Sequence, residues 1–388
     1  SVIFIFTIFI QFLTPNLMMK YYKNFRISDD ENYRMGYINN APNPKLRWEK
    51  TRDVKVALDF GLWKDRINGI VEAYWRKSKD CVTSEYVPVT TGFFNQSYNT
   101  SVLQNNGVEF SLSVAVLKSK DYNLSVSANV AWNQNKLKKY NSPNTSLALD
   151  KYVGYPMGAV FSGKYEGIDP ETGMYKFKLR PDAVTNKDGY LREPNNYYYY
   201  LGTSVAPFTG GFNLNFSYKN IGLSVGGSYS VKAKMVDNIE SPAGYELLSG
   251  SKLESIPTPH NDLYRNHLNV KREVRNRWTP ENRTGVKYPR LIDAYGKKLG
   301  LDLTNPTLTT ITRGALLEDI SYLRINTIAL SYSLPQRVLE RINFSSAALN
   351  LTLNNFFTIT KYSGIDPEVP GATYPVSRSV TIGLNVGF

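Results

Sequence analysis

Hydrophobic and polar residues alternate with a period of two in many separate stretches of the chain. The clearest stretches are residues 54–62, 108–116, 122–132, 212–218, 221–229, 349–353 and 380–388. Successive side chains of a β-strand point to opposite faces of its sheet, so each stretch is predicted to be a strand with one apolar and one polar face. The polar positions are mainly Ser, Asn, Thr and Gly, which suit a wet, crowded lumen behind an apolar face turned to lipid. A soluble β-sandwich would also alternate, so the pattern alone leaves both architectures open.

The lengths of the connections separate these two architectures. Short connections are expected at 63–65, 118–121, 219–220 and 335–343, and long ones at about 80–103, 138–206, 236–313 and 361–374. Short and long connections therefore alternate along the chain. This is typical of bacterial outer-membrane barrels, whereas loops beyond about 15 residues are uncommon in compact soluble domains.

We therefore predict an all-β fold, an antiparallel transmembrane β-barrel. About nine to eleven strands are expected, with short periplasmic turns and long extracellular loops. The two largest loops are predicted to hold local helices or short hairpins, with residues 247–254 and 262–277 as candidates. No stretch approaches the roughly 18 apolar residues of a membrane-spanning helix, which excludes an α-helical membrane protein and leaves a barrel open.

The segment 1–42 is set apart from the barrel part, 43–388, because its beginning is atypical. Residues 2–13 (VIFIFTIFIQFL) are almost wholly apolar but too short to span a membrane as a helix. They resemble the hydrophobic region of a signal peptide, without an initiating Met or a basic segment before them. A truncated gene, a shifted start and a damaged barrel strand fit this segment equally well.

Composition narrows the possible partners. Tyrosine occurs 28 times and the aromatic residues recur near strand ends, as in the aromatic girdles of membrane barrels or in any β-protein rich in aromatic strands. The net charge is +13, but the Lys and Arg residues are scattered over loops and turn flanks, so we expect no nucleic-acid binding. The basic loops are expected either to be ordinary solvated charge or to meet lipopolysaccharide phosphates or an acidic partner.

The sequence offers little for catalysis or metal binding. Cys81 is the only cysteine, and His260 and His267 are the only histidines, which argues against a disulfide, a zinc site and a histidine-based triad. No P-loop, GxSxG or HExxH motif occurs, and no acidic pair has the arrangement of glycosidase carboxylates. We predict no enzymatic activity, no cofactor and no metal.

Two short motifs remain. The segment Tyr165 to Glu171 (YEGIDPE) recurs as Tyr362 to Glu368 (YSGIDPE), and Asp followed by Pro favours a turn. The alternative is a calcium site built from Asp169 and Glu171 or from Asp366 and Glu368, with too few acidic ligands nearby to favour it. The second motif is the run Tyr197, Tyr198, Tyr199 and Tyr200 in a long loop. Its rings are candidate ligand contacts that could stack on sugars, or else they pack the loop or meet a partner.

Several segments, taken in order, resemble the SusC/RagA family of Bacteroidetes nutrient transporters. The stretch Asn43 to Lys50 (NPKLRWEK) is followed by LDFG at 58–61 and NGVE at 106–109. Further segments are GYPMG at 154–158, GIDPETG at 167–173, RW at 277–278 and PR at 289–290. The match is best near the end, with LEDISYLRI at 317–325, LSYSLP at 330–335, NNFF at 354–357 and the last strand to Phe388. Each segment is weak alone, but their order across 43–388 is specific.

This resemblance implies a TonB-dependent outer-membrane importer of glycans or peptides. It implies a SusD-like surface lipoprotein as a lid, and contact with the TonB complex through a plug domain that the family places before residue 43. It also implies that Phe388 belongs to the terminal signal read by the barrel-assembly machinery, although an ordinary apolar strand end would look the same. Outer-membrane lipid and lipopolysaccharide complete the expected partners.

The resemblance also raises the question of completeness. A full transporter of this kind closes about 22 strands, and nine to eleven strands either close a narrower barrel or leave two open edges. We therefore expect a fragment that lacks the plug and the first half of the barrel. A smaller closed outer-membrane barrel with a structural or adhesive role is the alternative, and a non-functional truncated product is a third.

Overall fold

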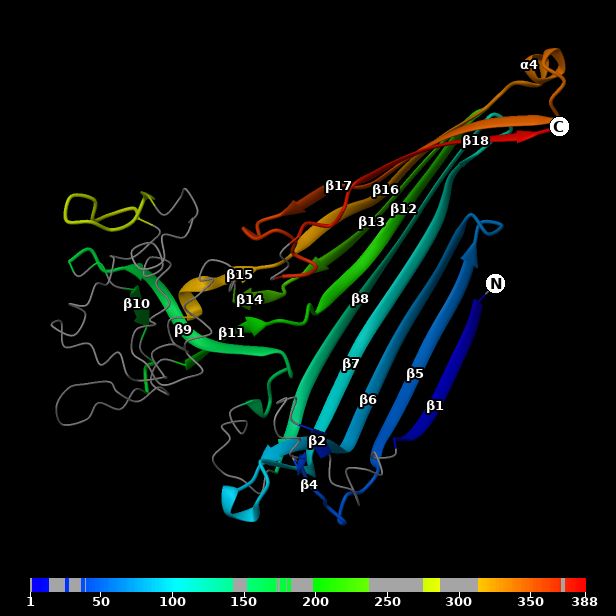
Figure 1. The fold of residues 1–388 in the computed structure, drawn as a ribbon. Coiled ribbons are helices and arrows are strands. Elements are labelled where there is room, and N and C mark those ends of the chain that lie inside the picture. Colours follow the sequence, from blue (N-terminus) through cyan, green and yellow to red (C-terminus); the bar gives the residue numbers. More distant parts are fainter. Residues whose placement is uncertain are drawn as a thin grey trace.

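The structure is a computed structural model dominated by one large antiparallel sheet (Figure 1). It describes residues 2–13, 25–27, 36–38, 40–141, 152–171, 173, 175–178, 180–182, 198–236, 275–286, 313–370 and 374–388. The strands follow the order β1 (Val2–Leu13), β5 (Glu49–Leu62), β6 (Ile67–Tyr86), β7 (Asn95–Lys118), β8 (Tyr122–Tyr140), β12 (Phe208–Tyr218), β13 (Ile221–Val231), β16 (Tyr322–Ser333), β17 (Ser346–Thr360) and β18 (Ser379–Gly387). A two-residue strand, β4 (Asn40–Ala41), pairs in parallel with the start of β7. The predicted all-β antiparallel fold is confirmed.

The connections alternate in length as predicted. Residues 63–66, 119–121 and 219–220 make tight turns, and 334–345 makes a longer one that holds α4 (Gln336–Arg341). These connections lie together at one end of the sheet, which we call the turn end, and the long connections lie at the other, the loop end (Figure 1).

One predicted loop is wrong. Most of residues 80–103 is strand, because β6 continues to Tyr86 and β7 begins at Asn95, which leaves 87–94 with a single 3-10 turn, η1 (Val89–Thr91). Asp80 has a φ of 56°, and the register shifts between Ser78 and Cys81. This irregularity breaks the alternation in the sequence while the two strands stay paired, so the hairpin extends further than the pattern indicates.

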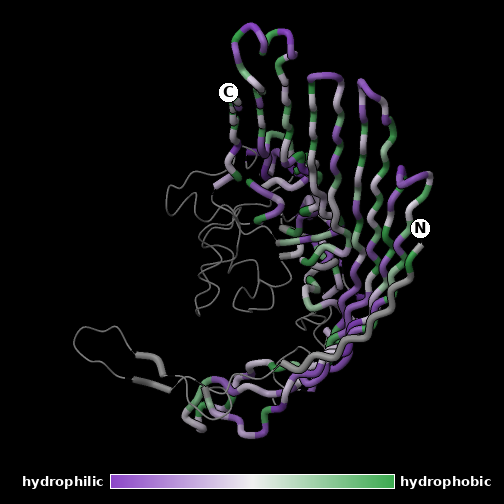
Figure 2. Tube along the Cα trace, turned by 90° about the vertical axis from the view of Figure 1, so that its right-hand side faces the viewer, coloured by the Kyte–Doolittle hydropathy of each residue, from purple (hydrophilic) through white to green (hydrophobic). Residues whose placement is uncertain are grey.

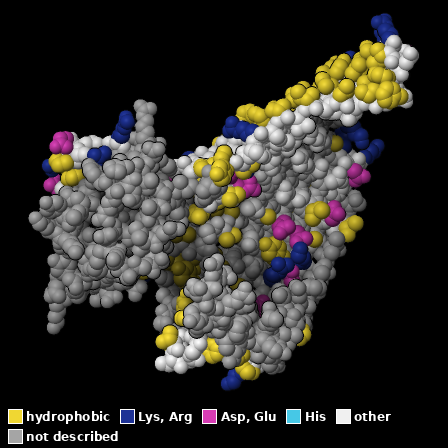
Figure 3. Space-filling model, viewed as in Figure 1, with side chains coloured by type: hydrophobic (Ala, Val, Ile, Leu, Met, Phe, Trp, Pro, Cys, Tyr) yellow, Lys and Arg dark blue, Asp and Glu magenta, His cyan; other side chains and the backbone are white. Residues whose placement is uncertain are grey.

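In β8, β12, β13, β16, β17 and β18, the register places apolar and polar side chains on opposite faces of the sheet, as predicted. On one face, Phe216 of β12 lies between Leu124 of β8 and Leu223 of β13. On the other face, the next row places Asn215 between Ser125 and Ser224. Figure 2 shows the alternation along each strand, and Figure 3 shows a continuous apolar strip along β17 and β18.

The long connections form smaller structures at the loop end. One holds a three-stranded sheet of β10 (Tyr175–Lys178), β9 (Ala159–Ile168) and β11 (Tyr198–Thr203), which satisfies the expectation of a local hairpin. The next supplies η7 (Arg313–Leu316) and the pair β14 (Lys234–Val236) and β15 (Leu317–Asp319). The candidate segment 247–254 lies outside the described residues. So does the candidate segment 262–277 up to residue 274.

A small apolar core joins three of the long connections. Ala233, Ile320 and Tyr362 are buried together, with Ala206 and Met235 packed against them. We call this set the loop cluster. It ties the segments that follow β8, β13 and β17 into one structure, so these segments support one another.

The first segment of the chain also joins the sheet. β1 pairs with β5 along its full length, from Val2 opposite Phe60 to Leu13 opposite Glu49. β1 and β18 stand at the two ends of the strand order, so the sheet is open among the strands that the structure describes. Within the same described residues, no helix has the length and apolar character needed to cross a membrane.

Candidate functional site

The polar face of β8, β12, β13, β16, β17 and β18 is almost free of charge. One continuous cross-strand row consists of Ser113, Ser127, Asn213, Gly226, Thr327, Asn354 and Ser379. Its side chains bond to one another: Thr327 Oγ1 lies 3.1 Å from Asn354 Oδ1, and Asn354 Nδ2 donates to Ser379 Oγ at 3.0 Å. We call this surface the neutral wall. Its hydroxyl and amide groups can both donate and accept hydrogen bonds to a polar solute.

The polar face of β5, β6 and β7 is different, because it carries a charged patch of Asp53, Lys55, Glu72, Arg76 and Glu109. Arg76 Nη2 lies 2.6 Å from Asp53 Oδ2, and Lys55 Nζ lies 2.5 Å from Glu72 Oε1. Glu72 and Glu109 lie directly opposite each other in the β6–β7 register, and Oδ1 of the buried Asp53 has no hydrogen-bond partner. The five residues of the patch comprise three carboxylates and two cations. Figure 3 shows acidic and basic side chains close together on this face. The period-two pattern did not reveal this patch, since it depends on which strands become neighbours.

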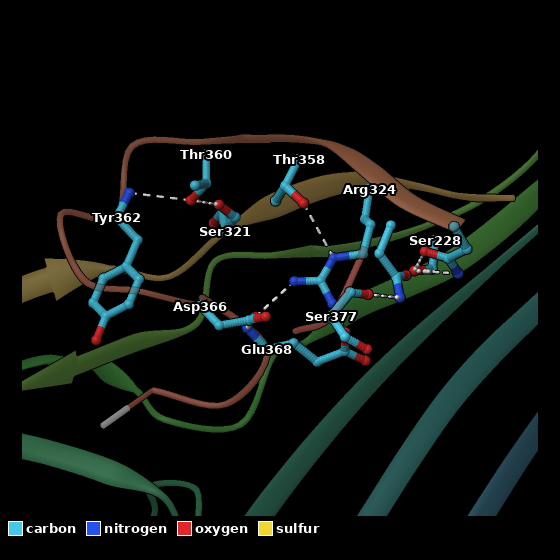
Figure 4. Close-up of polar contacts among 11 residues, drawn as sticks. Ser228, Ser321, Arg324, Thr358, Thr360, Tyr362, Asp366, Glu368 and Ser377 are labelled. Carbon is cyan, nitrogen blue, oxygen red and sulfur yellow. Dashed lines mark hydrogen bonds and ion pairs between the residues drawn. The ribbon is translucent and has the colours of Figure 1, made fainter. Parts of the chain in front are cut away.

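A buried ion pair anchors the last long connection to the neutral wall (Figure 4). Arg324 of β16 places Nη2 at 2.6 Å from Asp366 Oδ1 and Nη1 at 2.6 Å from Glu368 Oε2. Its Nε donates to Thr358 Oγ1 at 3.2 Å. The Arg324 and Asp366 side chains are only 6% and 4% exposed. The segment 361–370 is thus held against β16 and β17 by charge as well as by the loop cluster.

Both copies of the repeated motif are turns, as predicted. Asp366 Oδ1 accepts the N–H of Glu368 at 2.8 Å, and Asp169 Oδ1 accepts the N–H of Glu171 at 2.9 Å. Arg324 holds the second copy, whereas the buried Trp278 donates its indole N–H to Pro170 O of the first at 2.9 Å. In the second copy, the guanidinium of Arg324 binds the Asp366 and Glu368 carboxylates that a calcium ion would need. No group of three His, Cys, Asp or Glu among the described residues is suited to a metal ion.

The tyrosine run does not form a platform of four rings. Tyr197 lies outside the described residues, and Tyr198, Tyr199 and Tyr200 belong to β11 rather than to an irregular loop. Successive strand residues face opposite ways, so Tyr199 points away from its two neighbours. The run therefore divides between the two faces of the small sheet.

Tyr200 alone of the three described tyrosines lines a hollow, of about 280 Å³, between β8 and the β9–β11 sheet. Its ring centroid lies 4.9 Å from that of Tyr155 and 5.7 Å from that of Phe161. Trp132 and Asn133 of β8 line the other side. Burial raises the pKa of the Tyr200 hydroxyl, and the neighbouring Tyr155 adds to the effect. The hollow combines aromatic rings with amide groups, a combination suited to a sugar ring or a peptide side chain.

Phe388 follows directly after β18 at the turn end. Its side chain is 92% exposed, and its ring packs edge-on against Phe344 with the centroids 5.2 Å apart. The two rings lie beside α4, which precedes β17. An exposed aromatic ring at this end is available to other molecules.

The chain is similar to known TonB-dependent receptors over most of its length, although no protein-family model matches it. TonB-dependent receptor P26 of Formosa agariphila is 25% identical over 386 residues, which cover 90% of this chain and 36% of that receptor. TonB-dependent receptor SusC of Bacteroides thetaiotaomicron is 25% identical over 373 residues, covering 90% of this chain and 33% of SusC. The chain thus spans about a third of the length of these relatives.

A solved structure of the RagAB peptide transporter has the same fold. It superposes with a TM-score of 0.70 and 26% identity, covering 94% of this chain and 38% of that chain. These relatives confirm the predicted resemblance to SusC and RagA and the outer-membrane location that such receptors share. They are receptors and transporters rather than enzymes, in agreement with the sequence analysis.

Proposed function

We propose that this chain is the C-terminal part of the barrel wall of a TonB-dependent importer that carries an oligosaccharide or a peptide across the outer membrane. The observation that carries the proposal is the two-faced sheet, in which β8, β12, β13, β16, β17 and β18 present an apolar face and a polar face that is almost free of charge. Such a sheet suits a closed barrel between lipid and water, in which every strand edge is paired. In the complete barrel, the strands that pair with the free edges of β1 and β18 would come from the rest of the transporter.

The height of the apolar face supports a membrane-spanning role. Aromatic residues mark both ends of it: Tyr122 and Trp132 on β8, and Tyr218 and Phe208 on β12. Ten residues separate the two members of each pair, which is about 34 Å along a strand at about 3.4 Å per residue. With a tilt of about 40°, the apolar band is about 25 Å tall, as in outer-membrane barrels.

The two parts of the polar face suit two different roles in this importer. The neutral wall is suited to line the route of an uncharged polar solute, since apart from the Arg324 ion pair it offers hydroxyl and amide groups. The charged patch has an excess of carboxylate, and the facing Glu72 and Glu109 repel each other. A basic group of the plug domain placed there would relieve this repulsion, so the patch is suited to dock the plug.

The partners follow from the two ends of the sheet. We place a SusD-like lipoprotein over the loop cluster, and we assign TonB contact to the plug. Phe388 at the turn end suits recognition by the barrel-assembly machinery. Tyr200 in its hollow is the ligand contact that we retain from the tyrosine run. RagAB is described as a peptide transporter, which keeps peptide beside oligosaccharide as the solute.

The test is uptake in living cells. The chain would be expressed with the amino-terminal plug and strands of its transporter, and uptake of labelled oligosaccharides and peptides would be measured with and without TonB. We expect accumulation of one solute class that is lost without TonB. Uptake that is unchanged without TonB would contradict the proposal.

A gel experiment decides between a barrel part and a smaller closed barrel. The chain alone would be directed to the outer membrane and analysed before and after boiling. We expect no compact heat-sensitive band, because two strand edges lack partners. A compact band that unfolds on boiling would show that these strands close unaided, and the structural or adhesive barrel would then replace the importer.

The role of Tyr200 is tested by two substitutions in the same transporter. Tyr200→Ala removes the ring and is expected to weaken solute binding about tenfold, since stacking and hydrophobic contact are lost. Tyr200→Phe keeps the ring and should bind almost as well as the natural chain. Equal binding by all three proteins, measured by calorimetry, would exclude Tyr200 as a ligand contact.

A further inference from the structure

A row of exposed side chains crosses the apolar face at the turn end. The row is in register from strand to strand and consists of Tyr122, Tyr218, Ile221, Tyr332, Leu349 and Leu384. Each of the six side chains is more than 40% exposed. Tyrosine combines an apolar ring with a hydroxyl that needs a polar partner, so it favours the boundary between lipid tails and headgroups. We call this set the rim row.

Basic side chains gather at the turn end, in its four connections and at the last residue of β7. They are Lys64, Arg66, Lys118, Lys120, Lys219, Arg337 and Arg341, and all are exposed. The acidic side chains of the same connections are Asp65, Asp121 and Glu340. Seven positive charges against three negative ones leave an excess of four. Within the part of the chain that the structure describes, none of the seven forms an ion pair.

The two sets form one surface. Lys219 Nζ lies 5.3 Å from the ring centroid of Tyr218, so a cation and a rim-row ring are in direct contact. Successive turns are separated by two strands, or about 10 Å along the rim at about 4.8 Å per strand. The positive charge is therefore spread as a belt around the sheet edge rather than gathered in a patch of the kind that binds one small anion.

We propose that this belt binds anionic glycerophospholipids. The Lys and Arg side chains contact the phosphodiester headgroups while the rim-row rings lie at the level of the ester groups beneath them. The proposal rests on the proposed function in one respect, that the apolar face meets lipid. It goes further in assigning a headgroup charge and naming the residues that select it.

The charge of the belt and its position both favour anionic lipid as the occupant. Each Lys or Arg close to an anionic lipid surface strengthens binding by about fivefold, and the belt supplies seven. A protein partner would be expected to bury a compact area with a defined centre, whereas the belt follows the sheet edge over four separate connections. The connections are at the end that faces the periplasm in the proposed barrel, where the leaflet is phospholipid.

The experiment measures which lipid the full chain retains. The chain, joined to the amino-terminal plug and strands of its transporter, would be inserted into vesicles of three parts phosphatidylcholine and one part phosphatidylglycerol. It would then be extracted with mild detergent, and its bound lipids counted by mass spectrometry. We expect phosphatidylglycerol to be enriched over its share in the vesicle, and the enrichment to fall as salt is raised, because salt screens exposed charges.

Six substitutions at the belt test the residues: Lys64→Gln, Lys118→Gln, Lys120→Gln, Lys219→Gln, Arg337→Gln and Arg341→Gln together. The matched control removes six exposed lysines at the loop end: Lys45, Lys138, Lys139, Lys164, Lys232 and Lys361, each changed to Gln. In the belt variant the phosphatidylglycerol share of the bound lipid should fall to its share in the vesicle, and the control should keep the enrichment.

The outcomes separate this proposal from the proposed function. Insertion without enrichment, or equal loss in the belt variant and the control, would overturn the belt and leave the barrel wall untouched. A completed transporter that enters neither mixed vesicles nor pure phosphatidylcholine would overturn both, since the apolar face of this chain would then not meet lipid. Circular dichroism of each variant confirms that its strands are formed.

Discussion

The guanidinium of Arg324 and the carboxylate of Asp366 meet at 2.6 Å although 42 residues separate them in the chain. Arg324 lies on a strand of the sheet and Asp366 in the connection that follows the next strand. Their contact converts the last long connection from an independent loop into a part of the wall.

Removal of this buried cation should release the connection. Arg324→Met leaves the buried Asp366 carboxylate unpaired, and we expect a loss of about 3 kcal/mol in the free energy of unfolding. Residues 361–370 should also become accessible to protease. Both effects are measured on the folded transporter by denaturant titration and by mapping of cleavage sites.

The control for Arg324 is an exposed ion pair of the same composition. Arg47 pairs with Asp80 at 3.0 Å, but its side chain is 66% exposed. Arg47→Met should therefore lower the free energy of unfolding by less than about 1 kcal/mol. Equal effects of the two substitutions would show that burial of the Arg324 pair does not matter.

Neutralisation of one acid in the charged patch should stabilise the sheet. Glu109 lies opposite Glu72, and Lys55 bonds only to Glu72 among the described contacts. Glu109→Gln removes the repulsion and should raise the free energy of unfolding by about 0.5 kcal/mol. Urea titration of the plug-free barrel checks this, with Glu171→Gln in an exposed turn as the control. A destabilised Glu109→Gln protein would contradict the repulsion between the two carboxylates.

Gly314 is expected to tolerate no side chain. A Cβ at this position would lie 1.8 Å from the carbonyl oxygen of Gly163, so Gly314→Ala must push η7 away from β9. We expect the free energy of unfolding to fall by about 2 kcal/mol and protease cleavage in the loop cluster to increase. A Cβ at Gly383 of β18 would meet nothing within 4 Å, so Gly383→Ala should behave as the natural chain.

The aromatic cluster around Tyr200 should respond to alkaline pH. Burial raises the pKa of Tyr200 above its ordinary value near 10, so the folded state holds this proton more tightly than the unfolded state. The stability that the neutral hydroxyl confers is full below pH 10 and is lost as the pH rises through the raised pKa. Absorbance at 295 nm of the natural chain minus that of Tyr200→Phe gives the titration. A difference midpoint below pH 10 would contradict the burial.

The sequence predicts the regular part of the fold well, for a physical reason. On strands such as 212–218, burial against lipid and exposure to water alternate residue by residue, so the pattern is local and readable. The β6–β7 hairpin is underestimated because the bulge at Asp80 interrupts that pattern while the hydrogen bonds of the ladder continue.

The candidate site is predicted less well, because its contacts are not local. Nothing in the sequence near Arg324 indicates Asp366, and the register that places Glu109 opposite Glu72 is set by strand pairing rather than by spacing. The tyrosine run shows how strand geometry limits such a prediction. Four adjacent aromatic residues indicate a shared surface, but a β conformation divides the described members between two faces.

The neutral wall has a kinetic consequence for any solute in contact with it. Polar side chains on one face of a strand recur about every 7 Å, so a hydroxyl of the solute reaches a new partner as it leaves the last one. Between the turn end and Arg324 these partners are chemically alike and uncharged, so neighbouring positions on the surface offer a solute similar hydrogen bonds. Such a surface can hydrogen-bond a moving solute without holding it at one position.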